Sequence, residues 1–184
     1  MPTPRVAVFI ATSLDGCIAR TDGSLDWLDL VKNDGEDYGY AEFMQGLDTV
    51  LMGRATWDVV RGFDPWPYEG KRVVVLTHRP ESVEHGEELA SGPIDHVLEQ
   101  LGATGSSWVY IDGGVVIRQA LQAGMVDELI LSIVPVILGD GPKLFGPDLP
   151  ERTLRLVSSQ VWPSGLVQLR YSVGSSPAPR PGAA

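Results

Sequence analysis

Residues 49–62 read TVLMGRATWDVVRG, an apolar run that stops at a glycine and continues with a helix-like pattern. The first five residues predict a buried strand and the remainder predict a short helix. Gly53 allows a tight turn between them, and the free N–H groups at the start of a helix favour an anion. Arg54 adds a guanidinium suited to phosphate, and Thr56 adds a hydroxyl. An ordinary strand-to-helix turn with a solvated arginine explains the same residues equally well.

A second apolar run also ends in polar residues with suitable chemistry. RVVVLT at 72–77 is the clearest strand in the sequence, and His78 and Arg79 follow it directly. Together with Thr77, these side chains suit a ribose 2′-phosphate or another nearby phosphate. The alternative is a polar loop in which they face solvent.

The third strand end carries a pair of glycines. SWVYID at 107–112 predicts a strand, and GGVVIRQALQAG at 113–124 predicts a helix with Gly124 in a C-cap position. Gly113 and Gly114 allow close approach of a ligand to the backbone at the helix N-terminus. The pattern is not GxGxxG, so the Rossmann fingerprint is absent, and a plain two-glycine turn remains the alternative.

The rest of the chain predicts strands that alternate with helices and finish in an antiparallel hairpin. This order favours a mixed, mostly parallel sheet with helices on both faces, in one domain over residues 1–174 followed by a disordered tail at 175–184. The other predicted segments are a strand at 5–11, a Gly- and Asp-rich loop at 13–27, helices at 36–46 and 95–103, a strand at 128–138 broken by Pro135, and hairpin strands at 153–162 and 166–173.

Composition narrows the classes of function. The chain has 184 residues, of which 43% are hydrophobic and 21% are charged, and its formal net charge is −10. This charge disfavours nucleic acid and anionic membranes as partners. We find no signal-peptide pattern and no apolar stretch of the ~20 residues that a membrane span needs, so we expect a cytoplasmic protein. The single cysteine, Cys17, excludes an internal disulfide, and we expect no metal site.

Taken together, the motifs resemble those of the dihydrofolate-reductase-like family, most closely the branch related to the reductase domain of bacterial riboflavin biosynthesis. The matching segments span most of the chain. They are FIATSLDGCIA at 9–19, DGSLDWL at 22–28, LMGRATW at 51–57, VVVLTHRP at 73–80, VYIDGG at 109–114 and DELILSIVPVILGDGPKLF at 127–145.

The resemblance implies a dihydrofolate reductase-like three-layer α/β/α fold and NADPH as hydride donor. One departure is Ala55, where many relatives have Lys or His, so the preference for NADPH over NADH stays open. In dihydrofolate reductases the glycine pair is joined by a cis peptide, which Gly113–Gly114 can share. The implied cofactor contacts are Ala11, Gly16 and Ile18 at the nicotinamide; Gly53, Arg54, Thr56, Gly113 and Gly114 at the phosphates; and Thr77, His78 and Arg79 at the adenosine phosphate.

The same resemblance suggests candidates for proton delivery and substrate binding. A helix carboxylate fifteen positions before the Met of the MGR motif corresponds to Asp37, and the adjacent Tyr38 can pack against a heterocycle. A solvated aspartate at an acidic helix start is the alternative. Asp15 of the SLDG motif is a second candidate, with a turn-forming role as its alternative. Trp27 contributes to a rebuilt substrate wall, and Lys71 is a candidate for an anionic substrate group.

The charge of one segment bears on the substrate. Residues 34–42 carry Asp34, Glu36, Asp37 and Glu42 and no cation, so a phosphate seated on that face would be repelled. Either Lys143 in the late loop compensates or the substrate lacks a phosphate.

Three functions remain open at this point. The first is an NADPH-dependent reductase of a pterin- or pyrimidine-like heterocycle. The second is an NADPH-binding sensor or partner protein with weak catalysis, and the third is a reductase of nonphysiological small molecules. Relatives in the riboflavin-type branch are commonly dimers. The apolar strand within 129–138 would suit a homodimer interface, unless it lies wholly inside its own sheet.

Overall fold

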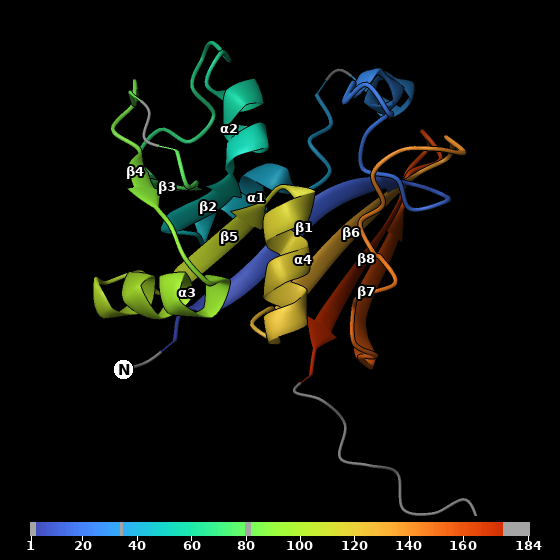
Figure 1. The fold of residues 1–184 in the computed structure, drawn as a ribbon. Coiled ribbons are helices and arrows are strands. Elements are labelled where there is room, and N and C mark those ends of the chain that lie inside the picture. Colours follow the sequence, from blue (N-terminus) through green and yellow to red (C-terminus); the bar gives the residue numbers. More distant parts are fainter. Residues whose placement is uncertain (1–2, 34, 80–81, 175–184) are drawn as a thin grey trace, which may run out of the picture.

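The computed structural model describes residues 3–33, 35–79 and 82–174, so the tail predicted at 175–184 lies outside the described residues. Most of the chain between these limits forms a single sheet with helices packed on it (Figure 1). The strands are β1 (Arg5–Ser13), β2 (Thr49–Gly53), β3 (Arg72–Leu76), β4 (Glu88–Ala90), β5 (Trp108–Asp112), β6 (Glu128–Val134), β7 (Leu154–Val161) and β8 (Val167–Val173). The helices are the 3-10 helix η1 (Asp26–Val31) and α1 (Tyr40–Gln45), α2 (Arg54–Val60), α3 (Ile94–Ala103) and α4 (Gly114–Ala123).

The sheet has eight strands in the order β4-β3-β2-β5-β1-β6-β8-β7. The first six strands of this order run parallel, and β8 and β7 pair antiparallel at the end. This confirms the predicted mixed sheet with a C-terminal hairpin. The short β4 was not predicted, because its three residues carry no apolar run and form a strand only by pairing with β3.

Helices cover both faces of the sheet, which confirms the predicted three layers. Helices α3 and α4 pack on one face, in front of the sheet in Figure 1, where Val6 and Val8 of β1 point. Ala7 of β1 points to the opposite face, which α1 and α2 cover through residues such as Phe43 and Trp57. Alternation of side chains along β1 therefore supplies both cores. No helix of the described residues is long and apolar enough to cross a membrane.

The helix predicted at 36–46 is shorter than expected. It begins at Tyr40, because Gly39 takes a left-handed conformation (φ 80°) and Tyr38 before it also has a positive φ of 54°. A tyrosine adopts this backbone conformation rarely, so tertiary contacts must hold it. The Tyr38 hydroxyl donates to the carbonyl oxygen of Val31 and lies 3.2 Å from Ser164 Oγ, and Gln168 Nε2 donates to the Tyr38 carbonyl at 3.1 Å.

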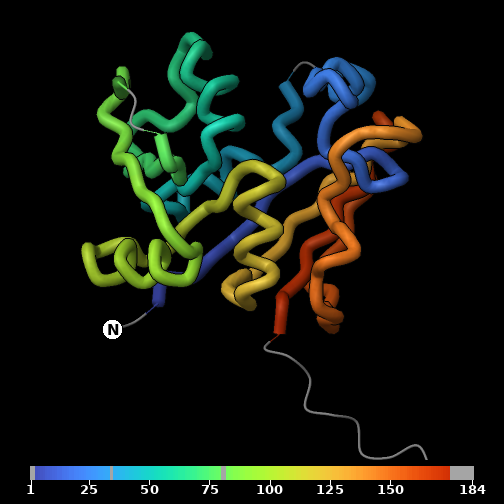
Figure 2. Tube along the Cα trace, in the orientation of Figure 1, coloured from blue at the N-terminus to red at the C-terminus, as the bar shows by residue number. Residues whose placement is uncertain are grey.

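The carboxyl ends of the parallel strands meet at one edge of the sheet, where two long loops lie side by side. In Figure 2 the loop after β1 runs next to the loop after β6. The contact is a short backbone ladder: Ile18 N donates to Pro142 O at 2.8 Å, and Leu144 N donates to Gly16 O at 2.9 Å. Two loops that are far apart in the sequence thus pair side by side at this edge of the sheet.

Strand β6 lies inside the sheet, between β1 and β8. The backbone edges of the strand predicted at 128–138 are therefore used within the chain, and the strand ends at Val134, before Pro135. The strand was interpreted either as a homodimer interface or as a strand wholly inside its own sheet, and the structure shows the second arrangement. A homodimer stays a prediction.

Candidate functional site

The glycine pair after β5 packs directly against the first turn after β2 and the loop after β1. A Cβ added to Gly113 would come within 2.2 Å of Thr56 Oγ1, and one added to Gly114 within 2.1 Å of Ile18 Cδ1. A Cβ on Gly53 would come within 3.0 Å of Val116. Five of the residues implied for the cofactor therefore pack together as one glycine cluster, which consists of Ile18, Gly53, Thr56, Gly113 and Gly114.

Glycine is required at these positions, because the side chains of Thr56, Ile18 and Val116 occupy the space that a Cβ would need. Gly113 also requires its residue type through its backbone, with φ 95° at the N-cap of α4. The cis peptide of the described residues is Asp64–Pro65, so the Gly113–Gly114 bond, for which a cis form was left open, is trans. The left-handed conformation of Gly113 makes the tight turn from strand to helix with a trans bond.

The cationic residues expected at the phosphates occupy the outer part of the same edge. Arg54 Nε bonds both oxygens of Asp58, at 2.8 and 3.0 Å, and its guanidinium lies 5.3 Å from the Trp57 ring centroid. Thr77 Oγ1 accepts the backbone N–H of Arg79 at 3.1 Å, which fixes the turn after β3. His78 and Arg79 are exposed.

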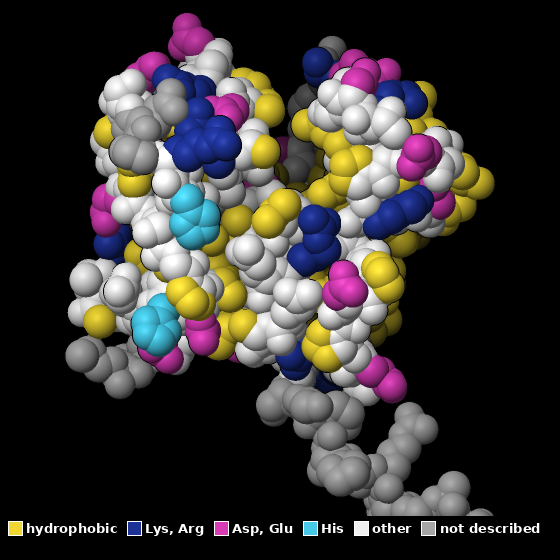
Figure 3. All heavy atoms as spheres, viewed as in Figure 1, with side chains coloured by type: hydrophobic (Ala, Val, Ile, Leu, Met, Phe, Trp, Pro, Cys, Tyr) yellow, Lys and Arg dark blue, Asp and Glu magenta, His cyan; other side chains and the backbone are white. Residues whose placement is uncertain are grey.

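Figure 3 shows a hollow at the top of the molecule between two lobes, with Lys and Arg side chains gathered on the left-hand lobe. Comparison with Figure 1 places α2 on that lobe and η1 on the other. The hollow therefore opens at the carboxyl ends of the strands, the edge at which ligands bind in open α/β sheets.

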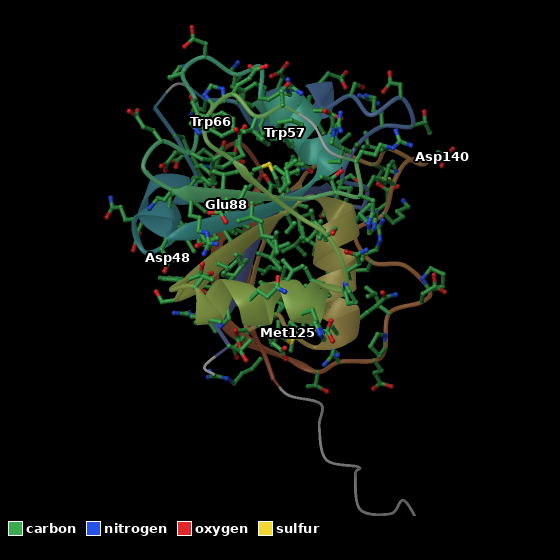
Figure 4. All side chains as sticks on the ribbon, turned by 60° about the vertical axis from the view of Figure 1, so that its left-hand side comes forward. Asp48, Trp57, Trp66, Glu88, Met125 and Asp140 are labelled. Atoms are coloured by element: carbon green, nitrogen blue, oxygen red, sulfur yellow. The ribbon has the colours of Figure 1, made fainter. Side chains whose placement is uncertain are left out.

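A buried carboxylate that the sequence did not reveal anchors α2. Glu87 is 5% exposed, and its oxygens accept the indole N–H of Trp57 at 2.8 Å and the backbone N–H groups of Glu84 and His85 at 3.1 and 2.8 Å. Burial raises its pKa, but these hydrogen bonds outweigh burial and the net pKa is lowered. Figure 4 shows Trp57 and Trp66 together at this end, far from Met125. Glu87 thus fixes the helix that carries Thr56.

A cavity of about 410 Å³ is lined in part by Phe9 and Ala11 of β1. One part of its wall is apolar or aromatic, and the other is polar and includes three carboxylates. The lining residues are Phe9, Ala11, Leu28, Val31, Val134 and Leu166, with Asp29, Lys32, Asn33, Glu36, Asp37, Tyr38 and Ser132. Ala11, expected against the nicotinamide, and Asp37 and Tyr38, expected at the substrate, therefore share one cavity.

Asp37 lies before α1 instead of within a helix, which corrects the expectation of a helix carboxylate. Its Oδ1 accepts the N–H of Gly39 at 3.0 Å, and its Oδ2 accepts the N–H of Ala41 at 2.8 Å. The carboxylate is exposed and lines the cavity. Because both bonds come from backbone donors of the same turn, Asp37 is held in place at the cavity wall.

Comparison with known proteins decides the family. A family model described as the RibD C-terminal domain matches residues 4–168. The chain belongs to the RibD C-terminal domain family. It is 36% identical over 171 residues to the uncharacterized protein YwjB of Bacillus subtilis (strain 168), covering 91% of this chain and 97% of that protein.

Solved structures agree with this assignment. A putative riboflavin biosynthesis protein from Shewanella sp. PV-4 superposes with a TM-score of 0.86 at 37% identity, covering 93% of this chain and 99% of that one. A pyrimidine reductase-like protein from Corynebacterium diphtheriae shares the fold, with a TM-score of 0.69 at 21% identity over 94% and 93% of the two chains. The resemblance drawn from the motifs is confirmed, and the fold is the dihydrofolate reductase-like fold of RibD reductase domains.

In this RibD C-terminal domain, Asp15 links the loop after β1 to the loop after β6. Its carboxylate accepts the Ser13 hydroxyl at 2.7 Å, the N–H groups of Leu138 and Gly139 at 3.0 Å each, and the Lys143 ammonium at 2.9 Å. The Lys143 ammonium above all, and then these other donors, lower the pKa of Asp15 well below its usual range. The group is therefore ionised and fully hydrogen-bonded at neutral pH.

Two residues predicted at the substrate lie outside the cavity wall. Trp27 is 2% exposed and packs behind the wall with Val31, Val134 and Leu166. Lys71 precedes β3, at the amino end of the strand, and its ammonium donates to Leu47 O at 2.6 Å. A larger hollow of about 550 Å³ also lies at that opposite edge, beside Arg5 and Asp127. It lies at the amino ends of the strands, whereas most of the predicted site residues lie at the carboxyl ends.

Asp112 is a further polar residue that the sequence did not single out. It ends β5 immediately before Gly113, and burial raises its pKa. The Tyr68 hydroxyl donates to Asp112 Oδ2 at 3.1 Å, and the Tyr110 hydroxyl donates to Phe9 O at 3.2 Å. An acidic residue in a strand end otherwise made of apolar residues, VYID, is the signal that would have found it.

Within the described residues, no group of three or more His, Cys, Asp or Glu side chains is placed to hold a metal ion.

Proposed function

We propose that this chain is an NADPH-dependent reductase of a pterin- or pyrimidine-like heterocycle. The observation that carries the proposal is that β1 and the loop after it contribute residues to both the acceptor cavity and the glycine cluster. Ala11 of β1 lines the cavity, and Ile18, a few residues later, contacts Gly114. Hydride transfer requires donor and acceptor held side by side, and an arrangement around one strand supplies that proximity.

The residues on the glycine side fit a dinucleotide. Helix α4 has ten residues and begins at Gly114, and its N-cap Gly113 provides no side-chain hydrogen bond to the N–H groups of the first turn. Such groups bind phosphate oxygens. Arg79 and Thr77 lie farther along the edge, after β3, which is two strands from β5, and we assign them to an adenosine phosphate. The nicotinamide, when bound, supplies the hydride.

The proton that accompanies the hydride is assigned to Asp37. Its carboxylate lines the cavity and is held by two backbone N–H groups. Asp15 is a weaker candidate, because four donors already saturate its oxygens and its lowered pKa keeps it ionised. A proton donor near an acceptor must exchange its proton at working pH.

The test is a titration with NADPH and NADH followed by assays of NADPH oxidation. Cofactor fluorescence is measured first, and then dihydrofolate, a ribosylaminopyrimidine and its 5′-phosphate are supplied as acceptors. We expect NADPH to bind in the micromolar range and at least one heterocycle to be reduced. Binding of neither dinucleotide below the millimolar range would refute the proposal. NADPH binding with no turnover of any heterocycle would favour a sensor or partner protein instead.

A further inference from the structure

The charged residues that line the acceptor cavity are predominantly acidic. Asp29, Glu36 and Asp37 contribute three carboxylates, and Lys32 contributes the one ammonium among the lining residues. The remainder of the wall is uncharged, with apolar side chains from β1, β6, η1 and the β7–β8 hairpin. The three carboxylates are exposed to solvent, so their repulsion of an anionic ligand is sensitive to salt.

Cations on neighbouring elements are already engaged. Lys143, whose loop lies beside the loop after β1, bonds Asp15 Oδ2 at 2.9 Å and Cys17 Sγ at 3.0 Å. Arg20 bonds Asp26 at the start of η1 at 2.6 Å. Arg170 of β8 bonds Glu128. The possibility that Lys143 compensates for the acidic wall is therefore not supported, since its ammonium holds the two loops together.

We propose that the acceptor is a neutral or protonated, amino-substituted nitrogen heterocycle that carries no phosphate, and that Asp29 and Glu36 determine this specificity. The inference rests on the proposed reductase function. Carboxylates accept hydrogen bonds from the amino groups and ring N–H groups of such heterocycles. A phosphate ester carries about −1.5 to −2 charges near neutral pH and is repelled by the same groups. A volume of about 410 Å³ lies within the range of pockets for ligands of this size.

The backbone of this segment supports a fixed arrangement of charge. Glu36 Oε1 accepts the N–H of Tyr38 at 2.9 Å, and Tyr38 is in turn held by Gln168 at 3.1 Å. Gln168 Nε2 also lies 3.0 Å from the hydroxyl of Ser132, which lines the cavity. The acidic turn is thus tied to the strand floor of the cavity, and its carboxylates face an incoming ligand from a defined position.

The experiment compares a ribosylaminopyrimidine with its 5′-phosphate on the full chain saturated with NADPH. Dissociation constants are measured by calorimetry, and KM is measured from NADPH oxidation. We expect the unphosphorylated compound to bind at least about tenfold more tightly. The difference should narrow as salt is raised, because ions screen exposed charges.

Two variants and a matched control assign the selectivity to residues. Asp29→Asn and Glu36→Gln each remove one negative charge from the wall and should each reduce the preference severalfold. Glu99→Gln removes the same charge from the exposed face of α3 and should leave the preference unchanged. Glu36→Gln alters a side chain that accepts the N–H of Tyr38, whereas Asp29→Asn leaves that hydrogen bond intact, so Asp29→Asn tests the charge without changing the turn.

The outcomes separate this inference from the proposed function. Equal or tighter binding of the phosphate by the wild-type chain overturns the inference, even if the phosphate is reduced and the reductase function stands. A preference that survives both variants overturns the assignment to Asp29 and Glu36. Selective binding of the unphosphorylated compound without turnover supports the inference, and the reductase function is contradicted only if dihydrofolate and the phosphate are not reduced either. Binding of neither compound overturns the inference.

Discussion

The ammonium of Lys143 lies 2.9 Å from the carboxylate of Asp15, across 128 positions of sequence. This pair and the backbone ladder beside it join the loop after β1 to the loop after β6. Because Ile18 of the first loop packs against Gly114, the pair also stabilises one side of the glycine cluster. Loops otherwise move most readily at such edges, so the pair restricts the site where ligands enter.

The lowered pKa of Asp15 predicts a specific dependence of stability on pH. The pKa of an unfolded aspartate is about 3.9 and the folded value is lower, so ionised Asp15 stabilises the fold above about pH 4. That contribution is lost as the pH falls from there toward the folded pKa. We expect Asp15→Asn to lower the urea midpoint near neutral pH, and the difference from wild type to shrink below about pH 4. A difference that grows in acid would contradict the assignment, and Glu99→Gln is the control.

Gly113→Ala should destabilise the fold and weaken NADPH binding. A Cβ at this position would lie 2.2 Å from Thr56 Oγ1, in addition to the strain of φ 95°. We expect a loss of about 2–4 kcal/mol in the free energy of unfolding, from backbone strain and overpacking together. Gly105→Ala is the matched control, since Gly105 has φ 103° and open space around its Cβ. Equal losses in the two variants would show that the contact with Thr56 is unimportant.

Arg79→Ala should weaken NADPH more than NADH. Arg79 is exposed at the end of β3 and is assigned to the 2′-phosphate, which only NADPH carries. We expect about a tenfold rise in the dissociation constant for NADPH and little change for NADH, measured by fluorescence titration. Arg155→Ala removes the same charge from the far edge strand β7 and should change neither. Equal losses for the two dinucleotides would remove Arg79 from this role.

Asp37→Asn should depress turnover while leaving NADPH affinity nearly intact. The amide keeps an acceptor oxygen for one of the two backbone donors, Gly39 or Ala41, but has no proton to deliver. We expect kcat to fall by about 100-fold or more, the range for loss of a general acid. Glu42→Gln on α1 is the control for charge. Unchanged kcat would move proton delivery to water or to Asp15.

Local patterns predicted most of the fold, because strong local signals agree with the tertiary structure in those places. The run ending at Thr77 forms β3, and the alternating hairpin forms β7 and β8. Prediction failed where distant contacts decide the backbone. The turn at Tyr38 interrupts the predicted helix because Val31, Ser164 and Gln168 hold it in a positive-φ conformation.

The site was predicted unevenly for the same reason. Motif order located Gly53, Thr56 and the glycine pair, which the structure brings together at the strand ends. Lys71 lies at the other edge, since a residue before a parallel strand and one after it are separated by the length of the strand. Glu87 was missed because it is marked by burial and by its bond to Trp57, 30 positions away, whereas Asp112 carried a local signal as the acidic end of an apolar strand.

The predicted site is divided between two sets of elements. The turns after β2 and β5 form the glycine cluster, whereas η1, the turn before α1 and the hairpin contribute to the cavity wall. Mutations in the second set can accumulate without touching the first. Under the proposed function, a lineage built on this scaffold can therefore acquire new acceptors by drift in surface loops while its reductant stays constant, and an engineer can exchange these loops together.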